Sequence, residues 1–510
     1  MLLWRLGDGP LADWDEAIYA EVAREVGWSH QLTVLYWNYG PWFAKPPLLM
    51  WSTAALFHVF EVSPFWARMT TATAGFGTVL LTVAIGTRVH RFWTGLLAGV
   101  VMLCCYQFVY SSRVGTTDVL LTFFIYLAVY LYLRARAQPW WWVGVGGALG
   151  LAVMTKGAAG LVGAGGIGLV YLADSGLRPS ALRQPHPWVG LATMFAVLLP
   201  WHLAAYRASG STFISEYIGY NVLGRASNSI EGHTGGIGTY VALVRHEFFP
   251  WAYLAVVAWG LAAWRCWTAE SRTWALPVIS LVVFSAFTVI STKLPWYILP
   301  IYPALAIMIA ALLVESLAGN GVAQVGLGAA ILVSVASIPQ SLPPYPAALR
   351  LLGAVAVVGV AVLSRTSRRS LAGPAMAATA LAFCGLVSWN YIAAVFGSSK
   401  PYIISPVYSG IIPVSLAAQR ETFGPADPLP IFIGAGGHML DTPVWPDVSF
   451  YSHRRVIELR SAADLDTYVH VNRRTDLLVA DSDRAGLEAR YSVKVVSSDG
   501  AYDYVSLSLR

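Results

Sequence analysis

Long apolar runs follow one another along most of this chain, and they limit what it can fold into. They occupy about residues 65–87, 92–110, 119–133, 140–155, 158–173, 188–206, 248–264, 275–291, 296–316, 323–342, 345–363 and 371–395. About 20 apolar residues cross the hydrocarbon core of a bilayer as one helix. Charged residues make up only 12% of the 510 residues, about half of their usual share in soluble domains. The sequence therefore predicts a polytopic α-helical membrane protein with about twelve visible spans.

Basic residues recur in the loops on one side of these runs. They are Arg88 and Arg91, Arg134 and Arg136, Arg178 and Arg183, Arg265 and Arg272, and Arg365, Arg368 and Arg369, after the first, third, fifth, seventh and eleventh runs. Short loops rich in Lys and Arg stay in the cytoplasm. Residues 1–64, 111–118 and 207–247 are therefore expected outside, in a plasma (inner) membrane protein. The net charge of +6 follows from these loops, so we expect no nucleic-acid partner.

An N-terminus outside the cytoplasm needs a preceding span or signal. The first six residues, MLLWRL, resemble the end of an apolar segment. We therefore expect a further helix upstream of Met1.

The tail of the chain differs in composition from the rest. Its apolar runs are short (LPIFIG, VSFYS, RVIEL, DLLVA, YSVKVV and YDYVSLSL), and AADLDTYVHV and SDRAGLEAR between them are typical of short helices. This pattern predicts a soluble α/β domain over residues 400–510, outside the cytoplasm, after a transmembrane domain over residues 1–395. The four cysteines show neither a disulfide pattern nor metal-ligand spacing.

The opening stretch LADWDEAIYAEVAREV, residues 11–26, is rich in carboxylates. Its apolar residues recur at helical spacing, which predicts an amphipathic helix on the membrane surface; they are Ile18, Tyr19, Val22 and Val26. One interpretation is that Asp13 caps this helix and Glu16 closes a capping box. The other is that Asp15 faces a cavity at the outer surface, where it accepts a proton from an acceptor hydroxyl.

Two further outer stretches carry charge. In FAKPPLLMW, residues 43–51, Lys45 either extends to the interface or offers its charge to a phosphate. In SSRVGTTDVLLTFF, residues 111–124, Asp118 either caps the following span or joins Asp15 in one site. Arg113 is either an ion-pair neighbour of Asp118 or part of the same site.

Later outer segments add cations and histidines. Lys156 and Lys293 fall at outer ends of spans and are interface anchors or site residues. The loop 207–247 contributes polar side chains that are either solvated or functional; they are Asn221, Arg225, Glu231, His233 and His246. A divalent ion held by acids and a histidine would fit this set.

Carboxylates and cations on one membrane face suit a substrate with a lipid-anchored phosphate and a hydroxyl to be deprotonated. The cations would stabilise the phosphate as a leaving group, and a carboxylate would activate the hydroxyl. This inventory predicts sugar transfer from a polyprenyl phosphate. A transporter is the rival, but it would place ionisable groups near the bilayer midplane. A scaffold or sensor with a ligand-binding tail is a third alternative.

Five motifs, in order along the chain, resemble a known family. They are DEAIYAE at 15–21, KPPL at 45–48, TDVLLTFF at 117–124, TKG at 155–157 and TKLPWYILP at 292–300. Together they are similar to the bacterial lipid A aminoarabinose transferase group of the C-type membrane glycosyltransferases, relatives of the dolichyl-phosphate-mannose protein mannosyltransferases. The resemblance covers about residues 11–316.

The resemblance implies an inverting transferase with thirteen spans, a polyprenyl-phosphate sugar donor, and an envelope acceptor such as a lipid A-like lipid or another glycan. A protein O-mannosyltransferase-type enzyme is the alternative. The site residues are then Asp15 and Asp118 for catalysis, Lys45, Arg113, Lys156, Lys293 and Tyr297 for the donor phosphate, Asp118 and His233 for a divalent metal, and Glu16, Tyr19 and Arg225 beside them.

Two positions depart from the family pattern. Ile18 stands where Arg is usual, and Ala44 stands where close aminoarabinose transferases often have Glu. The sugar and the metal site therefore stay open.

Overall fold

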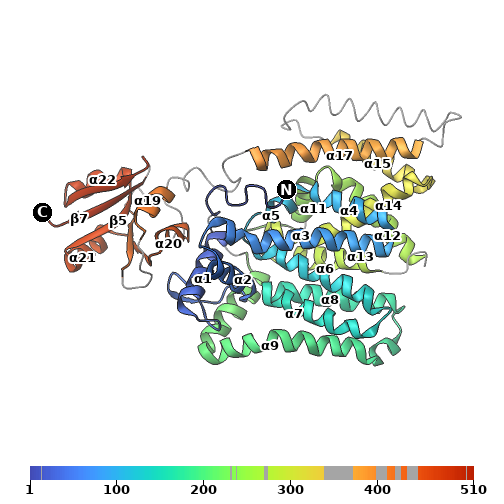
Figure 1. Ribbon diagram of the computed structural model, residues 1–510, viewed down its shortest axis with the longest axis horizontal. Helices are drawn as coiled ribbons and strands as arrows, with labels where there is room; N and C mark the ends of the chain where they lie inside the picture. Colours follow the sequence, from blue (N-terminus) through green and yellow to red (C-terminus); the bar gives the residue numbers. More distant parts are fainter. Residues whose placement is uncertain are drawn as a thin grey trace.

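The computed structural model describes residues 1–12, 14–229, 233–236, 238–268, 274–337, 372–397, 411–419, 427–433, 446–500 and 502–510. Long, roughly parallel helices form a bundle, and a small sheet with its own helices lies beyond one end of it (Figure 1). The helices α1 and α2 lie at that same end, between the bundle and the sheet (Figure 1). The fold is therefore mostly helical, with a small mixed sheet near the C-terminus.

The chain begins with α1 (Asp15–Ser29), the hairpin of β1 (Leu35–Trp37) and β2 (Gly40–Trp42), and α2 (Leu48–Val59). The bundle contains α3 (Pro64–Val89), α4 (Phe92–Leu103), α5 (Tyr106–Ser111), α6 (Thr117–Ala135), α7 (Trp142–Lys156), α8 (Ala158–Asp174), α9 (Pro185–Phe213), α12 (Trp251–Trp267), α13 (Ala275–Val289), α14 (Tyr302–Leu317), α15 (Gly321–Ala336) and α17 (Ala372–Gly397). Short helices connect them: η1 (Pro139–Trp141), η2 (Pro179–Arg183), η3 (Ile214–Gly224), α10 (Arg225–Ser227), α11 (Thr239–Glu247) and η4 (Pro295–Ile301).

The predicted apolar runs fall on these helices as far as the structure describes them; the run 345–363 and the end of the run 323–342, after residue 337, lie outside the described residues. Among the described residues, four helices are long and apolar enough to cross a membrane, at Pro64–Val89, Thr117–Ala135, Pro185–Ser227 and Pro295–Leu317. The bent pair α11 and α12 raises the number to five at most. The predicted count of twelve spans is not reached. The other described apolar stretches have only 10–17 residues, and a helix rises about 1.5 Å per residue against a core about 30 Å thick.

The segment 207–247, which we expected to be a loop, is largely helical. α9 continues to Phe213, and the chain then passes through the π-helix η3 and the short α10. Its apolar residues recur every three or four positions, as in Tyr217 and Tyr220, so a helical path buries part of them. The prediction of a loop was wrong for most of this segment.

The C-terminal sheet has strand order β4-β3-β5-β7-β6. Its strands are β3 (Leu429–Phe432), β4 (Val456–Leu459), β5 (Arg474–Ala480), β6 (Ser492–Ser498) and β7 (Tyr502–Ser508). β3 pairs in parallel with β4 and β5, whereas β7 is antiparallel to β5 and β6. On β5, Leu477 and Val479 join one core and Leu478 joins another, because successive side chains point to opposite faces. Both faces of the sheet are therefore covered.

The helices of this domain are α19 (Ile411–Ala417), α20 (Pro446–Ser452), α21 (Ala462–Asn472) and α22 (Asp481–Glu488). α21 and α22 form where the sequence predicts short helices. The run VSFYS, expected as a strand, forms α20 instead. α20 packs against α1, so this apolar run covers a helix of the other domain rather than extending the sheet.

α1 is enclosed on its polar side as well as its apolar side. All residues from Glu16 to Val26 are buried. The predicted helix is confirmed, but its polar side is also covered, because α20 packs on it in addition to α2 and β1.

Candidate functional site

Asp15 is the first residue of α1 and lies half-buried at its N-terminal end. Tyr19, one turn further on, is 3% exposed and hydrogen-bonds to the Asp15 carboxylate through its hydroxyl. Burial, together with the charge of Asp15, raises the pKa of Tyr19. The phenol therefore stays protonated and orients the carboxylate by donating to it.

Lys45 lies between β2 and α2, directly before Pro46 and Pro47. A proline cannot continue a strand and restricts the residue before it, so the chain turns here before α2 starts at Leu48. Burial lowers the pKa of Lys45 to about 8, although the neighbouring Asp15 carboxylate opposes this. Lys45 is therefore a partly desolvated cation close to Asp15.

Asp118 lies in the first turn of α6, and its carboxylate pairs with Lys156 at the end of α7. Both side chains are buried, at 3% and 8% exposure. The ammonium of Lys156 also lies 4.6 Å from the ring centroid of Tyr297 in η4, a cation–π contact. Asp118 makes no capping hydrogen bond to α6, so the capping interpretation was wrong.

Gly157 positions Lys156 in this pair. The chain turns sharply there between α7 and α8, with φ +54° and ψ −125°. A Cβ at this position would lie 2.7 Å from the Tyr217 hydroxyl. Glycine is the residue that reaches such a conformation without steric cost, which explains the TKG motif.

These groups form one electrostatic cluster. The charge of Asp15 acts on Asp118, and Lys45 interacts with Lys156 and Arg225. Arg225, at the start of α10, is half-buried and also interacts with Tyr297. The structure thus brings together seven of the expected residues from distant parts of the chain, namely Asp15, Tyr19, Lys45, Asp118, Lys156, Arg225 and Tyr297.

Lys293 has a different environment. Its ammonium donates to the carbonyl oxygens of Phe287 at 3.1 Å, Thr288 at 2.6 Å and Ile290. These carbonyls end α13, where a cation is favoured by the helix dipole. Lys293 therefore caps α13, although it lies 5.6 Å from the ring of Tyr240, which interacts with Tyr297.

Arg113 is also engaged away from Asp118. Its guanidinium donates to the carbonyl oxygens of Met1 and Leu2, both at 3.2 Å, and of Trp4 at 2.6 Å. It therefore ties the N-terminal segment to the bundle.

The expected metal ligands do not assemble into a coordination set. His233 accepts a hydrogen bond from the Lys293 N–H with its backbone oxygen. Asp118 is already paired with Lys156. Within the described residues, no group of three or more His, Cys, Asp and Glu side chains could hold an ion. The donors described here do not fit a divalent metal.

Glu16 has a structural role that the capping interpretation missed. Its carboxylate binds Arg68 of α3 at 2.8 Å and accepts the N–H groups of Ala12 and Gly115 at 2.6 and 2.7 Å. Asp13, the expected partner in the capping box, lies outside the described residues. Sequence reasoning also missed Arg68, although an Arg inside an apolar helix was a usable signal.

A cavity of about 920 Å³ lies at the other end of the bundle. Its lining includes Arg88, Arg136 and Arg265, which come from three of the basic loops that were expected on one side. It contains none of the residues in the Asp15 cluster. The basic loops and the candidate site therefore occupy opposite ends of the helices.

The cluster offers two carboxylates, three cations and two phenols in a small, partly buried volume. Desolvated cations bind a phosphate strongly, and a carboxylate beside them can take a proton from a hydroxyl. The arrangement is suited to displacing a phosphate by a deprotonated nucleophile.

A family model described as dolichyl-phosphate-mannose-protein mannosyltransferase matches residues 44–203. An uncharacterized protein of Aquifex aeolicus is 27% identical over 304 residues, covering 58% of each chain. An undecaprenyl phosphate-alpha-4-amino-4-deoxy-L-arabinose arabinosyl transferase of Enterobacter sp. is 26% identical over 313 residues, covering 58% of this chain and 54% of that protein. The chain thus spans little more than half the length of these curated relatives.

Solved structures show a similar fold over nearly the whole chain. ArnT from Cupriavidus metallidurans bound to undecaprenyl phosphate has a TM-score of 0.67 and 20% identity, covering 99% of this chain and 96% of that one. The Archaeoglobus fulgidus oligosaccharyltransferase has a TM-score of 0.54 and 11% identity, covering 96% and 69%. The resemblance inferred from the motifs is confirmed, and the fold is that of a multi-pass membrane protein.

Proposed function

We propose that this chain is a membrane glycosyltransferase, which moves a sugar from a polyprenyl-phosphate donor to an acceptor of the cell envelope at the extracytoplasmic face. The observation that carries this proposal is the Asp15 cluster, in which Lys45, Lys156 and Arg225 accompany two carboxylates. The match to the mannosyltransferase family model and the likeness to arabinosyl transferases support it.

The proposed reaction is a displacement with inversion at the anomeric carbon. Asp15 accepts the proton of the acceptor hydroxyl, and the oxygen attacks the anomeric carbon. The bond from that carbon to the phosphate oxygen breaks, and its electron pair leaves with the polyprenyl phosphate. Lys45, Lys156 and Arg225 stabilise the charge that develops on the phosphate. Tyr19 orients Asp15, and Asp118 with Tyr297 holds Lys156 in place.

The orientation rests on the basic loops. Arg88, Arg136 and Arg265 line the cavity at the end of the bundle away from Asp15. If that end faces the cytoplasm, the Asp15 cluster and the C-terminal domain face outward, where lipid-linked sugars and envelope acceptors meet. A lipid A-like lipid and a protein are the two acceptor classes that the resemblance of the motifs implies, and the description of the family model names a protein acceptor.

Mass spectrometry of envelope lipids and glycoproteins tests the proposal. A deletion strain is compared with strains complemented by the wild type, by Asp15→Asn, or by Asp8→Asn, an exposed aspartate that serves as a matched control. We expect a pentose- or hexose-sized mass that is lost on deletion and restored by the wild type and the control only. The molecule that carries this mass identifies the acceptor.

Two results would contradict the proposal. If Asp15→Asn restores the full amount of the sugar-sized mass at equal protein level, Asp15 does not accept the proton of the acceptor hydroxyl. An unchanged set of glycans in the deletion strain would instead favour a transporter or a scaffold.

A further inference from the structure

The side of α1 that faces the C-terminal domain carries charges with almost no access to water. Glu21, Arg24 and Glu25 are 0%, 4% and 1% exposed. Within α1, Arg24 donates to both oxygens of Glu21, through Nε at 2.7 Å and through a second, shorter contact. Buried charges are tolerated only where further polar partners complete their hydrogen bonds.

Some of those partners come from α20, more than 400 positions later in the chain. The Ser449 hydroxyl donates to Glu21 at 3.0 Å. The Leu11 N–H, just before α1, donates to the Tyr451 hydroxyl at 2.9 Å. Phe450 and Tyr451 are part of the apolar core that contains α1, rather than of the cores of the C-terminal sheet. α20 therefore packs in two directions, through Phe450 and Tyr451 against the α1 region and through Val448 against a core of the C-terminal sheet.

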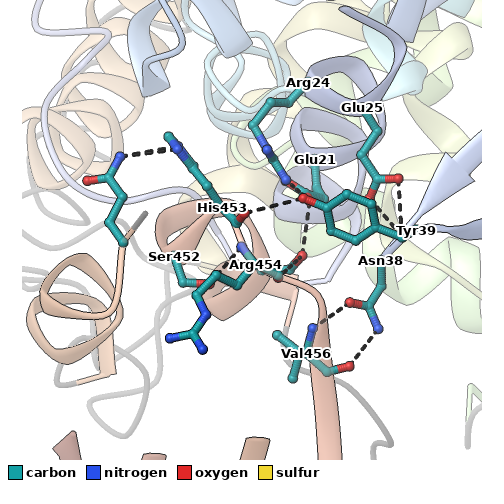
Figure 2. Close-up of polar contacts among 11 residues, drawn as sticks. Glu21, Arg24, Glu25, Asn38, Tyr39, Ser452, His453, Arg454 and Val456 are labelled. Carbon is teal, nitrogen blue, oxygen red and sulfur yellow. Dashed lines mark hydrogen bonds and ion pairs between the residues drawn. The ribbon is translucent and has the colours of Figure 1, made fainter. Parts of the chain in front are cut away.

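The turn of the β1–β2 hairpin supplies a second connection, drawn in Figure 2. The Asn38 side chain donates to the Val456 carbonyl at 2.9 Å and accepts the Val456 N–H at 2.7 Å. Tyr39 donates through its hydroxyl to the His453 carbonyl at 3.2 Å and through its N–H to both Glu25 oxygens at 3.1 Å. The hairpin turn therefore links α1 to the start of β4.

The backbone of this turn shows that these contacts are specific. Asn38 and Tyr39 both have positive φ, at +51° and +62°, as a two-residue hairpin turn of type I′ requires. Asn tolerates this conformation, but Tyr adopts it at a cost that surrounding contacts must offset. The bonds of Tyr39 to Glu25 and to His453 offset it.

Asp15 lies between the two α20 anchors of this interface. Leu11, four residues before it, is bonded to Tyr451, and Glu21, six residues after it, is bonded to Ser449. Six residues of helix rise about 9 Å, so a small shift of either anchor moves Asp15 relative to Asp118, which belongs to α6 of the bundle.

We propose that the C-terminal domain is a positioning clamp for α1, and that Ser449, Tyr451 and Asn38 are positioning residues that set the place of the Asp15 carboxylate. The role in transfer rests on the proposed function, whereas the docking of α20 on α1 does not.

Kinetics with the full-length protein in lipid vesicles test this role. The variants are Ser449→Ala, Tyr451→Phe and Asn38→Ala. Ser461→Ala is the matched control, since the Ser461 hydroxyl accepts the Asp464 N–H and donates to the Asp464 carboxylate at the start of α21, away from α1. A displacement of about 1 Å can reduce a rate by up to about 100-fold. We expect kcat to fall by about 10- to 100-fold in the three variants and to stay unchanged in the control.

The affinity for polyprenyl phosphate separates positioning from general damage. The cations that bind the phosphate are not touched by these variants, so its Kd should stay within about twofold of the wild type. Ser449→Thr keeps the hydroxyl and should restore most of kcat. A parallel loss of donor affinity and kcat, without rescue by Ser449→Thr, would overturn the positioning role.

Hydrogen exchange of the α1 amides gives a readout that does not depend on transfer. We expect faster exchange over residues 15–26 in Ser449→Ala and Tyr451→Phe, and no change in Ser461→Ala. Unchanged exchange would overturn the docking itself. Faster exchange with an unaltered kcat would overturn the positioning role. A wild type that transfers no sugar would count against the proposed function, while the exchange experiment would still decide whether the clamp exists.

Discussion

Lys156 and Asp118 form a buried ion pair across two helices, although 38 residues separate them in the sequence. The pair lies at the end of α7 and in the first turn of α6. Because Tyr297 covers the ammonium of Lys156, the cation is held in one place and is available to a phosphate on its remaining side.

Removing one member of this pair should be worse than removing both charges. Asp118→Asn leaves Lys156 without its anionic partner, and the loss of a partner from a buried pair costs about 3–5 kcal/mol. We expect transfer to fall by at least about 100-fold in Asp118→Asn. The double variant Asp118→Asn with Lys156→Met should regain stability but not activity. Thermal unfolding and transfer assays of the three proteins check this expectation, and an active double variant would contradict it.

Donor binding should weaken as the pH rises through about 8. Burial lowers the pKa of Lys45 to about 8, so the ammonium loses its proton above that pH and with it the charge that attracts phosphate. Lys45→Arg keeps a charge at every accessible pH and should remove this dependence. Titration of polyprenyl phosphate at pH 7 and 9.5 measures both effects. If donor binding has the same pH dependence in the wild type and in Lys45→Arg, a group other than Lys45 causes that dependence.

Lys293→Met should affect stability rather than donor affinity. The ammonium of Lys293 binds three carbonyl oxygens at the end of α13, and the loss of such a helix-end contact costs about 1 kcal/mol. Lys156→Met should instead abolish detectable donor binding. Binding and thermal unfolding of the two variants form a matched comparison. If Lys293→Met loses donor binding at unchanged stability, Lys293 contacts the donor phosphate after all.

Glu16→Gln should be strongly destabilising. Glu16 and Arg68 are 1% and 5% exposed and join α1 to α3, so an uncharged partner leaves the buried guanidinium with backbone carbonyl oxygens but without an anion. We expect a loss of about 3–5 kcal/mol. The exposed Glu61 provides the control Glu61→Gln, which should change stability by less than about 0.5 kcal/mol. Equal unfolding temperatures for the two variants would rule out a structural role for the Glu16–Arg68 pair.

The docking of α1 should be stronger at low pH. Burial, together with the charge of Glu21, raises the pKa of Glu25 from 4.5 to about 8. The folded state therefore binds a proton at Glu25 that the unfolded state releases, and this contribution to stability falls as the pH rises from about 4.5 to 8. The charge of Arg24 opposes the shift, and the Tyr39 N–H donates to Glu25. Burial lowers the pKa of His453, near Arg24 and Glu21, from 6.5 to about 4, so its contribution has the opposite sign below about pH 6.5, and the net loss of stability is expected between about pH 6.5 and 8.

Thermal unfolding at several pH values checks this sign. The wild type should unfold at a lower temperature at pH 8.5 than at pH 6, and Glu25→Gln should reduce the difference. A wild type that becomes more stable between pH 6 and 8.5 would contradict the prediction.

Much of the candidate site could be predicted from the sequence, because each of its charged residues has unusual neighbours in the sequence. Lys45 precedes two prolines, Lys156 precedes a glycine, and Asp118 begins an apolar run. Each has an unusual setting for a charge beside lipid. Short motifs therefore identify the members of the site without any knowledge of their contacts.

The contacts themselves could not be predicted in this way. Arg113 is only five residues from Asp118, yet the carboxylate pairs with Lys156, which comes from another helix. Glu16 has the spacing of a capping box but binds Arg68. In both cases a partner from another helix replaces the local one, and the spacing of residues along the sequence does not show which helices meet.

The sequence pattern also did not predict that the polar side of α1 is buried. Glu21, Arg24 and Glu25 lie away from the apolar stripe and are typical of a solvated face. The approach of α20, which the pattern assigns to a strand, and of the β1–β2 turn makes that face an interior. Fewer long apolar helices than twelve are found among the described residues, in part because hydropathy does not show where a run is interrupted, as at Cys104 between α4 and α5.

The bond between Ser449 and Glu21 joins residues that are 428 positions apart, and this separation has a consequence for biosynthesis. At about 5–20 residues per second, a ribosome needs roughly 20 to 90 s to extend the chain from one to the other. During this time the carboxylate of Glu21 has no hydroxyl from α20, and the helix that carries Asp15 is incompletely enclosed. The contact between α1 and α20 is thus completed only after translation has passed Ser449, and a chain that ends before this residue keeps the Glu21 side of α1 without it.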